Sequence, residues 1–422
     1  MIFYSIKEKY IFYHIPAILF SLMPLFLITG PFLPDFSISI IGILFLIYCF
    51  KHKNFTFFKK KYFYFYLLFC LYLVLNSIFN NFNIDSFKIS IFFFRYGLFI
   101  ISIAALLTIN NDLIKYFFYC IFICFTILIL DGFYQYFVGE NILGYKSGNK
   151  FRVSSFFRDE HILGSYISRL WPIFFGISIF ILKEKSKIFY FLITIFILSE
   201  VLIFLSGDRS AFFYINLTAI FIILFSKKLA KLRLITLFFS LIMIILISLF
   251  NPIAKQRVVD QTLNQMNINS KEKKDKQVYI FTKTHHEIFT SAYKMFLDNK
   301  IIGVGVKNFR NFCSEDKYYK NKRSCSNHPH NIYIQILAET GLVGFFFIAV
   351  VLFIFCKSII KHLSLRFKNK IYFSDFEICI LSGIAIYLWP FIPTGSIFNN
   401  WLNIVMIIQI PFIIWSRNQY HH

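Results

Sequence analysis

The sequence predicts an all-α, polytopic integral membrane protein with about twelve transmembrane helices. Of its 422 residues, 58% are hydrophobic and only 15% are charged, against roughly 25% charged residues in an average soluble protein. Apolar runs of about 16 to 25 residues recur along the chain, and each can cross about 30 Å of hydrocarbon as a helix. Because a lone strand would leave its backbone unpaired in lipid, the Ile- and Phe-rich runs are predicted as helices. This composition excludes a soluble protein.

The predicted organisation is one transmembrane domain over 1–422, with a large external loop at 251–330 inserted between the ninth and tenth spans. The first apolar run continues through Pro24 to Gly30 and lacks a small-residue cleavage site, so we expect it to remain as a helix. In chain order, the predicted spans are 11–30, 36–50, 62–79, 89–109, 113–137, 160–182, 188–205, 210–226, 233–250, 331–356, 375–394 and 399–416.

Lys and Arg residues predict the orientation of these spans. When the N-terminus is placed in the cytoplasm, the basic segments 51–61 and 357–370 also fall there, and the short external loops 31–35 and 395–398 carry no Lys or Arg. This alternation follows the positive-inside rule and predicts that both termini are cytoplasmic. The formal net charge of +23 is scattered over both membrane faces, so nucleic acid is not an expected partner.

Two of the eight cysteines, Cys313 and Cys325, lie in the large external loop, whereas the other six lie within spans or at their ends. In an oxidising compartment these two can form a disulfide, and closing a loop of about a dozen residues would contribute roughly 3 kcal/mol. The cysteines and histidines do not have the spacing of a metal site, and we expect neither a metal nor another cofactor.

A very short turn between the seventh and eighth spans places a cation at the external surface. It reads Ser-Gly-Asp-Arg-Ser over 206–210, with Arg209 beside Asp208. An arginine at a membrane surface commonly only anchors a helix in the interface. Against that interpretation, the Ser-Gly pair lets the backbone approach a ligand closely, and a guanidinium suits bidentate contacts with phosphate.

A second basic group precedes and enters the sixth span. Arg152 and Arg158 come before the span, and Arg169 lies about two to three turns inside it. Because an isolated arginine is costly in hydrocarbon, Arg169 should face a wet cavity or an acidic partner, for which Asp131 in the fifth span is the candidate. A purely structural ion pair is the competing interpretation.

The stretch 285–298 of the large loop is predicted as an amphipathic helix. Thr284 and Glu287 have the spacing of a capping box. An apolar side that can lie on the bilayer consists of Ile288, Phe289, Ala292, Met295 and Phe296.

The run 326–344 contains the strongest candidate for a catalytic base. Pro329 suits the first turn of a helix, so His330 is expected in the opening turn of the tenth span. The positive end of the helix dipole disfavours an imidazolium there, and a neutral ring suits a base near pH 7. A lone histidine in a loop is more often structural, but Gln335 and Glu339 continue a polar stripe below this one.

Together these motifs resemble the bacterial O-antigen ligase and O-antigen polymerase superfamily of multi-pass glycosyltransferases. The ligase-type signature is a His followed by Asn, Ser or Gln, then nine residues, then Gly-x-x-Gly. It is matched without gaps by His330, Asn331, the nine residues 332–340, Gly341 and Gly344. The two glycines also permit close helix packing. Three further stretches resemble family motifs, namely 206–209, 151–164 and 303–309.

The sequence departs from the family pattern at one place. Members often carry an arginine ahead of the W-x-x-A helix of the large loop, and His285, followed by His286, stands there in this chain. Either another basic residue, such as Lys283 or Arg310, supplies that charge, or the pyrophosphate is held differently.

The resemblance implies an undecaprenyl-diphosphate-linked glycan as donor, on the periplasmic face of the bacterial inner membrane, in lipopolysaccharide biosynthesis. We hypothesise a metal-independent, inverting transfer in which cations stabilise the departing diphosphate and His330 deprotonates the acceptor hydroxyl. The expected catalytic residues are His330 and Arg209. The expected diphosphate ligands are Arg152, Arg158, Arg169, Arg209 and His285, and the expected supporting residues are Asn331, Gln335, Glu339, Gly341 and Gly344.

Several functions remain open at this point. A ligase would transfer the glycan to lipid A–core, a polymerase would join lipid-linked repeat units, and a protein O-oligosaccharyltransferase would modify a protein. A transporter or lipid flippase belongs to a different class and predicts paired charges deep in several spans together with internal symmetry. The sequence instead gathers its polar features on one face, where a lipid-linked donor would approach from the surrounding membrane lipids.

Overall fold

The protein is helical throughout the residues that the structure describes, which are 5–420 without 81, 148–151, 183–186, 251–254, 267, 269–277 and 320. Within those residues this computed structural model contains no strand, and a single isolated bridge joins Glu140 to Lys146. The all-α class predicted from the apolar runs is therefore confirmed.

The first half of the chain forms short helices at its start and long ones after it. The elements are α1 (Ile6–Lys9), a π-helical turn (Tyr10–His14), α2 (Ile15–Ser21), α3 (Met23–Thr29), α4 (Phe32–Lys51), a 3-10 turn (Thr56–Phe58), α5 (Lys61–Phe79), α6 (Ile84–Phe92), α7 (Arg95–Ile109), α8 (Asp112–Val138), a 3-10 turn (Ser155–Phe157), α9 (Leu163–Ile181) and α10 (Lys187–Leu205).

The second half contains the external segment and the longest helix. The elements are α11 (Arg209–Phe225), α12 (Ala230–Phe250), a π-helical turn (Gln256–Asp260), α14 (Gln261–Gln265), α15 (Lys283–Asp298), α16 (Phe309–Phe312), a 3-10 turn (Lys322–Ser324), α17 (Ile332–Phe367), α18 (Asp375–Leu388), α19 (Asn400–Ile407) and α20 (Ile410–Tyr420).

Eight stretches of the described residues are long and apolar enough to cross a membrane. They are α4, α5, α6 together with α7, α8, α9, α10, α12 and α17. The helices on either side of Leu22 form a ninth if their bend of 55° lies within one span. These helices confirm a multi-pass membrane protein.

The last two predicted runs form helices that are shorter than expected. α18 has 14 residues, and the run 399–416 is divided between α19 and α20. α11 has the 17 residues that were predicted for it. Prolines account for two of these ends. Pro390 follows α18 closely, and Pro411 stands in the first turn of α20, where its missing N–H breaks no helical hydrogen bond.

The helix α9 lies inside the bundle. It packs against α8, α10, α11 and α18, and the side chains of Tyr166, Trp171, Phe174 and Phe175 are fully buried. Arg169 belongs to this helix and is only 3% exposed. Its guanidinium therefore points into protein rather than into lipid.

A buried ion pair joins α10 to α12. Arg233 Nη1 lies 2.5 Å from Glu200 Oε1, and the Ser240 hydroxyl donates to the other carboxylate oxygen at 2.6 Å. The Arg233 guanidinium also lies over the Trp171 ring, 4.4 Å from its centroid. This network ties three helices together at positions with almost no exposed surface.

We expect Glu200→Ala to lower the free energy of unfolding by about 3–5 kcal/mol, because it leaves the Arg233 charge buried without its carboxylate. Thermal unfolding of the purified protein in detergent measures the effect. Asp112→Ala is the matched control, since Asp112 pairs with Lys115 at an exposed position, where a pair contributes about 0–1 kcal/mol. A Glu200→Met/Arg233→Met double variant should recover most of the lost stability. If Glu200→Ala unfolded at the wild-type temperature, the expectation would be contradicted.

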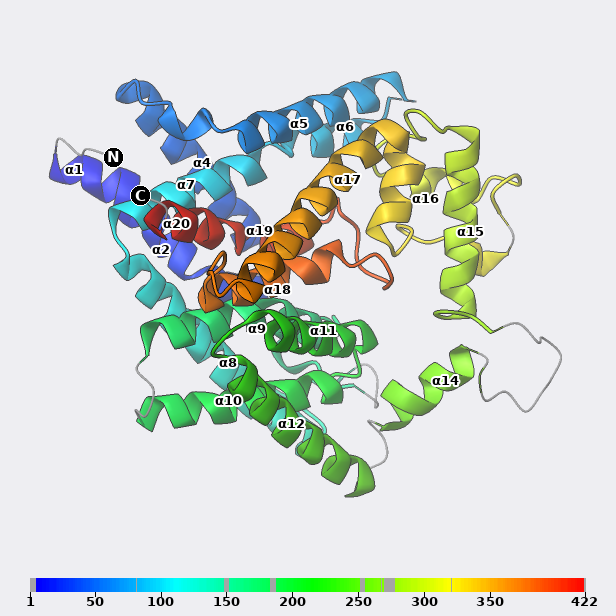
Figure 1. Cartoon of the computed structure of the whole chain (residues 1–422). Helices are drawn as coiled ribbons and strands as arrows, with labels where there is room; N and C mark the ends of the chain where they lie inside the picture. Colours follow the sequence, from blue (N-terminus) through cyan, green and yellow to red (C-terminus); the bar gives the residue numbers. More distant parts are fainter. Residues whose placement is uncertain are drawn as a thin grey trace.

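The external segment and the chain ends lie at opposite ends of the molecule. Helices α14 and α15 are at the right of Figure 1, whereas α1 and α20 are at the left. We call the end that carries α15 the α15 face. The functional residues predicted from the sequence lie in or beside the loops of this face.

Candidate active site

The residue after His330 begins the longest helix. Asn331 is the N-cap of α17, and its side-chain oxygen accepts hydrogen bonds from the backbone N–H groups of Tyr333 at 3.0 Å and Ile334 at 3.1 Å. Its amide donates to the carbonyl of Pro390 at 2.7 Å. The expectation that His330 lies within the first turn is therefore wrong. The helix begins at Ile332, and Pro329 and His330 precede it.

His330 occupies a constrained loop position. Its backbone φ of 56° lies in the left-handed region, and its carbonyl accepts a hydrogen bond from Thr394 N at 2.8 Å. Its Nε2 lies 3.0 Å from the Ser326 hydroxyl. Burial lowers the pKa of the His330 imidazole below its usual value of 6.5. The ring is therefore neutral near pH 7, and the physical cause in the structure is burial.

Two further histidine rings surround His330. The His328 ring centroid lies 4.1 Å away, and the His285 ring of α15 lies 5.6 Å away, edge to face. Burial, reinforced by the charges of His330 and Arg209, lowers the pKa of His285 to about 4. The structure thus brings His285, which stands at the family's arginine position, next to the candidate base as a neutral group.

Helix α15 begins two residues earlier than its predicted cap implies. Thr282 is the N-cap, accepting from His285 N at 3.2 Å, and its hydroxyl also lies 2.8 Å from His285 Nδ1. The expected cap at Thr284 is therefore wrong. Thr282 both starts the helix and holds the His285 ring.

The apolar side of α15 packs on protein rather than on lipid. Ile288, Ala292 and Met295 are buried in a cluster with residues of α16 and α17 and of the loops between them. The bilayer position that the sequence suggested for this side is therefore wrong. The segment 299–331 folds back under α15 and covers it.

The two glycines of the His330 motif have different structural roles. Gly341 interrupts α17 with a φ of 65°, and Gly303, with a φ of 71°, faces the same break. A Cβ atom at either glycine would meet backbone of the opposite segment. At Gly344 a Cβ would instead meet the Thr340 side chain and, at 3.3 Å, the Tyr72 ring.

Backbone hydrogen bonds join the external segment to this break. Val304 N donates to Ala338 O and Gly305 N to Glu339 O, both at 2.9 Å, and Leu342 N donates to Lys300 O at 2.8 Å. A helix interrupted in this way leaves backbone groups that need partners. The loop 300–305 supplies them, so the Gly-x-x-Gly motif fixes the loop that follows α15.

Gln335 and Glu339 hold neighbouring loops. Glu339 Oε1 accepts from Phe309 N at 3.1 Å, and Glu339 Oε2 accepts from Gln335 Nε2 at 2.9 Å. Gln335 also donates to the Ser396 hydroxyl at 2.8 Å and accepts from Ile397 N at 3.2 Å. These contacts make both residues structural supports that connect α16, α17 and the loop before α19.

The turn 206–210 presents Arg209 at the start of α11. Asp208 caps this helix by accepting from Ala211 N at 3.1 Å, and Gly207 has a φ of 64°. Arg209 Nε donates to Arg257 O at 3.3 Å, and its Nη1 donates to Gln265 Oε1 at 2.7 Å. Its Nη2 is buried and has no hydrogen-bond partner.

Arg152 lies close to the same turn. Its Nε donates to Ser206 O at 3.0 Å, and its Nη2 donates to His161 O at 3.2 Å. Burial and the charge of Arg257 lower the pKa of Arg152, and the charge of Asp208 partly opposes this. Arg152, Arg209 and Arg257 thus form a cationic group, which favours an anionic ligand.

Arg169 and Asp131 do not form the predicted ion pair. Asp131 accepts hydrogen bonds from the Ser155 hydroxyl and from Ile142 N, and so holds the loop that follows α8. Arg169 Nη1 instead contacts the Ser165 hydroxyl at 2.5 Å, and its guanidinium lies 4.6 Å from the Tyr214 ring centroid. The alternative expectation for Arg169, a cavity, matches what the structure contains.

A cavity of about 1360 Å³ lies between α3, α8 and α9 and the loops that precede α9, α11, α17 and α19. One wall is apolar and consists of residues of α3 and α8 and of Leu22, which lies between α2 and α3. These are Leu22, Leu25, Leu27, Ile28, Ile123 and Ile127. The basic end contains Arg158, Arg169, Lys307, Arg310 and His328, with Asp208 and Glu160 among them.

Only some of the predicted diphosphate ligands line this cavity. Arg158 and Arg169 line the cavity, and the Arg158 guanidinium lies over the Tyr145 ring at 4.6 Å. The other four predicted ligands and bases do not line it, namely Arg152, Arg209, His285 and His330. Sequence reasoning missed Lys307 and His328, although both stand inside stretches that it had singled out.

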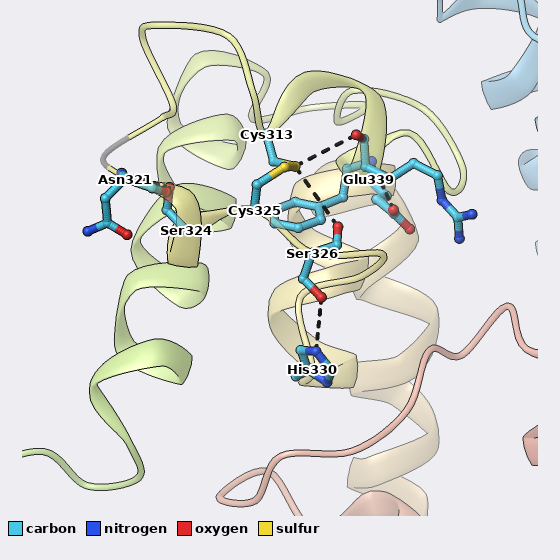
Figure 2. The surroundings of a disulfide bond; sticks show 9 residues. Cys313, Asn321, Ser324, Cys325, Ser326, His330 and Glu339 are labelled. Carbon is cyan, nitrogen blue, oxygen red and sulfur yellow. Dashed lines mark hydrogen bonds between the residues drawn. A yellow bond between two sulfur atoms is a disulfide. The ribbon is translucent and has the colours of Figure 1, made fainter. Parts of the chain in front are cut away.

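A disulfide between Cys313 and Cys325 lies beside His330 (Figure 2). The Cys313 sulfur lies 3.9 Å from the carbonyl oxygen of Ser326, whose hydroxyl contacts the His330 ring. On the other side, Cys313 N donates to Phe309 O at 2.9 Å, and Phe309 is held by Glu339. The disulfide therefore joins the loop before His330 to the end of α16, which Glu339 of α17 holds through Phe309.

We expect a Cys313→Ser/Cys325→Ser variant to lose about 3 kcal/mol of stability, because reduction frees a loop of about a dozen residues. Transfer activity should also fall, since Ser326 is released with the loop. Unfolding followed with and without a reductant measures the first effect. Cys356→Ser is the control, because Cys356 is a free, exposed cysteine. If the variant unfolded at the wild-type midpoint, and a reductant left the wild-type midpoint unchanged, the disulfide would contribute nothing to stability.

Comparison with known proteins gives a family for the part of the chain that contains this site. A family model described as O-antigen ligase matches residues 193–349, which include the turn at Arg209, α15 and the His330 motif. The fold and this match together define a membrane protein of the glycosyltransferase class. This match supports the O-antigen ligase and polymerase superfamily that the motifs predicted. No curated protein matches the chain.

Proposed function

We propose that the protein is an O-antigen ligase that transfers a glycan from undecaprenyl diphosphate to a hydroxyl group of lipid A–core, at the periplasmic face of the inner membrane. The cavity is the observation that carries this proposal. Its apolar wall and basic end suit the two chemically different halves of a lipid diphosphate, a hydrocarbon chain and a dianionic headgroup.

Part of the apolar wall is exposed. Leu25 of α3 is 43% exposed and Ile123 of α8 is 53% exposed, and both line the cavity. We infer that a hydrocarbon chain would lie against this wall, because its exposed side chains are apolar. This supports a lipid-linked donor over a water-soluble one.

The basic end provides the charges that a diphosphate requires. Burial and the neighbouring Arg310 charge lower the pKa of Lys307, so the two cations oppose one another in the absence of an anion. Arg169 Nε is buried and lacks a hydrogen-bond partner. A diphosphate would relieve the repulsion between Lys307 and Arg310 and would also pair the Arg169 donor.

The proposed reaction is a single displacement. The acceptor oxygen attacks the anomeric carbon of the donor sugar while His330 takes the hydroxyl proton. The bond between that carbon and the diphosphate oxygen breaks, and undecaprenyl diphosphate leaves with the electron pair. Arg209, whose free Nη2 is aimed by two hydrogen bonds on its other nitrogens, would stabilise the developing negative charge together with the cavity cations.

Reconstitution tests the proposal directly. The full chain in nanodiscs, with undecaprenyl-diphosphate-linked glycan and lipid A–core in a chelating buffer, should yield glycosylated lipid A–core. A polymerase would instead lengthen the glycan on undecaprenyl diphosphate, and either outcome is visible on one gel. In cells, deletion of the gene should leave long polymers on undecaprenyl diphosphate. Single repeats attached to lipid A–core would overturn the ligase assignment in favour of polymerisation.

A further inference from the structure

His328 is the histidine that the cavity touches. It lines the basic end together with Asn327 and Arg310, whereas His330 lies behind it, with the two ring centroids 4.1 Å apart. The His330 Nε2 already has the Ser326 hydroxyl as a partner. A ligand in the cavity would therefore meet the His328 ring first.

The hydrogen bonds of His328 define which ring nitrogen carries its proton. Burial lowers the pKa of His328 to about 4, and a hydrogen bond to the Thr394 backbone partly opposes this. Nε2 is buried and has no hydrogen-bond partner. We therefore assign the ring proton to Nδ1, with the Thr394 carbonyl as its acceptor. Nε2 of the neutral ring is then a free acceptor.

The free Nε2 lone pair favours a ligand group that can donate a hydrogen bond. A buried polar atom without a partner costs free energy that a bound donor group recovers. Diphosphate oxygens are acceptors and would meet the Nε2 lone pair with repulsion. A sugar hydroxyl can donate a hydrogen bond to it. The cations Arg310 and Lys307 lie in the same lining, so hydroxyl and diphosphate subsites would adjoin.

We propose that His328 Nε2 accepts a hydrogen bond from a hydroxyl group of the acceptor glycan, and so positions that glycan beside His330 for attack on the donor. This inference rests on the proposed function, because it places the acceptor of that reaction. It assigns His328 to acceptor binding and leaves proton transfer to His330. The loop 390–395 supports both rings, since Thr394 contacts His328 through its backbone and donates to His330 O.

Acceptor kinetics on the full chain in nanodiscs test this assignment. We expect His328→Leu to raise KM for the acceptor by about tenfold, the worth of one hydrogen bond, with kcat and the donor KM close to wild type. His328→Gln should restore most of the affinity, because its amide oxygen can replace Nε2 as an acceptor. His286→Gln is the matched control on the exposed side of α15.

A binding measurement separates this inference from the proposed function. Core oligosaccharide and the repeat-unit glycan released from its lipid diphosphate, both taken from the cells that make the protein, are titrated without a donor. Loss of binding in His328→Leu, with recovery in His328→Gln, would support the inference. This holds even if the wild-type protein transfers glycan to neither acceptor. That second result would overturn the ligase proposal but not the inference. Wild-type binding of both probes by His328→Leu, or a raised KM for the donor, would overturn the inference.

Discussion

His330→Gln should lower kcat by about 100- to 10,000-fold, the range that positioned general bases contribute. The acceptor hydroxyl would then lose its proton without assistance, while the cations that hold the donor stay in place. The KM for the donor should therefore change little. Initial rates in nanodiscs at saturating donor and acceptor measure the effect. His286→Gln, which makes the same change at an exposed position of α15, should keep wild-type activity.

The pH profile gives an independent test of the same role. Burial lowers the pKa of His330 below 6.5, and a general base acts only when it is neutral. The rate should therefore be independent of pH from about 8 down to about 6.5 and should fall as the pH drops through the His330 pKa. This acid limb should disappear in His330→Gln. A variant with near wild-type kcat, or an unchanged acid limb in the variant, would remove His330 from proton transfer.

Arg209→Gln should lower kcat by about 100- to 1,000-fold, as expected when one preorganised donor to a developing negative charge is removed. Arg209 is held in place through Nε and Nη1, and its Nη2 remains free. Arg209→Lys should recover only part of the loss, because an ammonium cannot reproduce the planar fork. Single-turnover rates with bound lipid-linked donor separate this effect from donor binding.

Arg323→Gln is the matched control for this prediction, because Arg323 is an exposed arginine on the α15 face outside the cavity lining. Its activity should equal that of wild type. If Arg209→Gln instead raised only the KM for the donor, Arg209 would belong to ground-state binding. If it changed neither parameter, the residue would serve only to hold the turn between α10 and α11.

The sequence alone predicted the helical class and the positions of the helices, because both depend on local properties. Apolar length and backbone satisfaction in lipid leave few alternatives to a helix, so every predicted run is helical even where α18 and α20 are short. His330 and Arg209 were predicted as site residues from equally local properties. Each stands at a recognisable boundary between an apolar run and a loop, where a charged or titratable side chain is unusual.

Side-chain partners could not be predicted with the same success. The pairing of Arg169 with Asp131 followed from charge alone, yet the two helices turn these residues toward different neighbours, Ser165 and Ser155. Hydropathy alone is as compatible with the apolar side of α15 lying on the bilayer as with its packing on protein. Its burial against α16 and α17 depends on a loop that folds back through Gly303, a long-range contact that no local pattern specifies.

The sequence by itself determined that this is a multi-pass membrane protein and carried the motifs that resemble the O-antigen ligase and polymerase superfamily, since hydropathy and motif spacing depend on consecutive residues. Only the tertiary structure decided which of its basic residues line the cavity and which lie outside that lining. Lys307 and His328 join Arg158 and Arg169 there because the break at Gly341 and the disulfide at Cys313 bring distant loops onto one end of the bundle. Those contacts arise from packing between segments far apart in the chain.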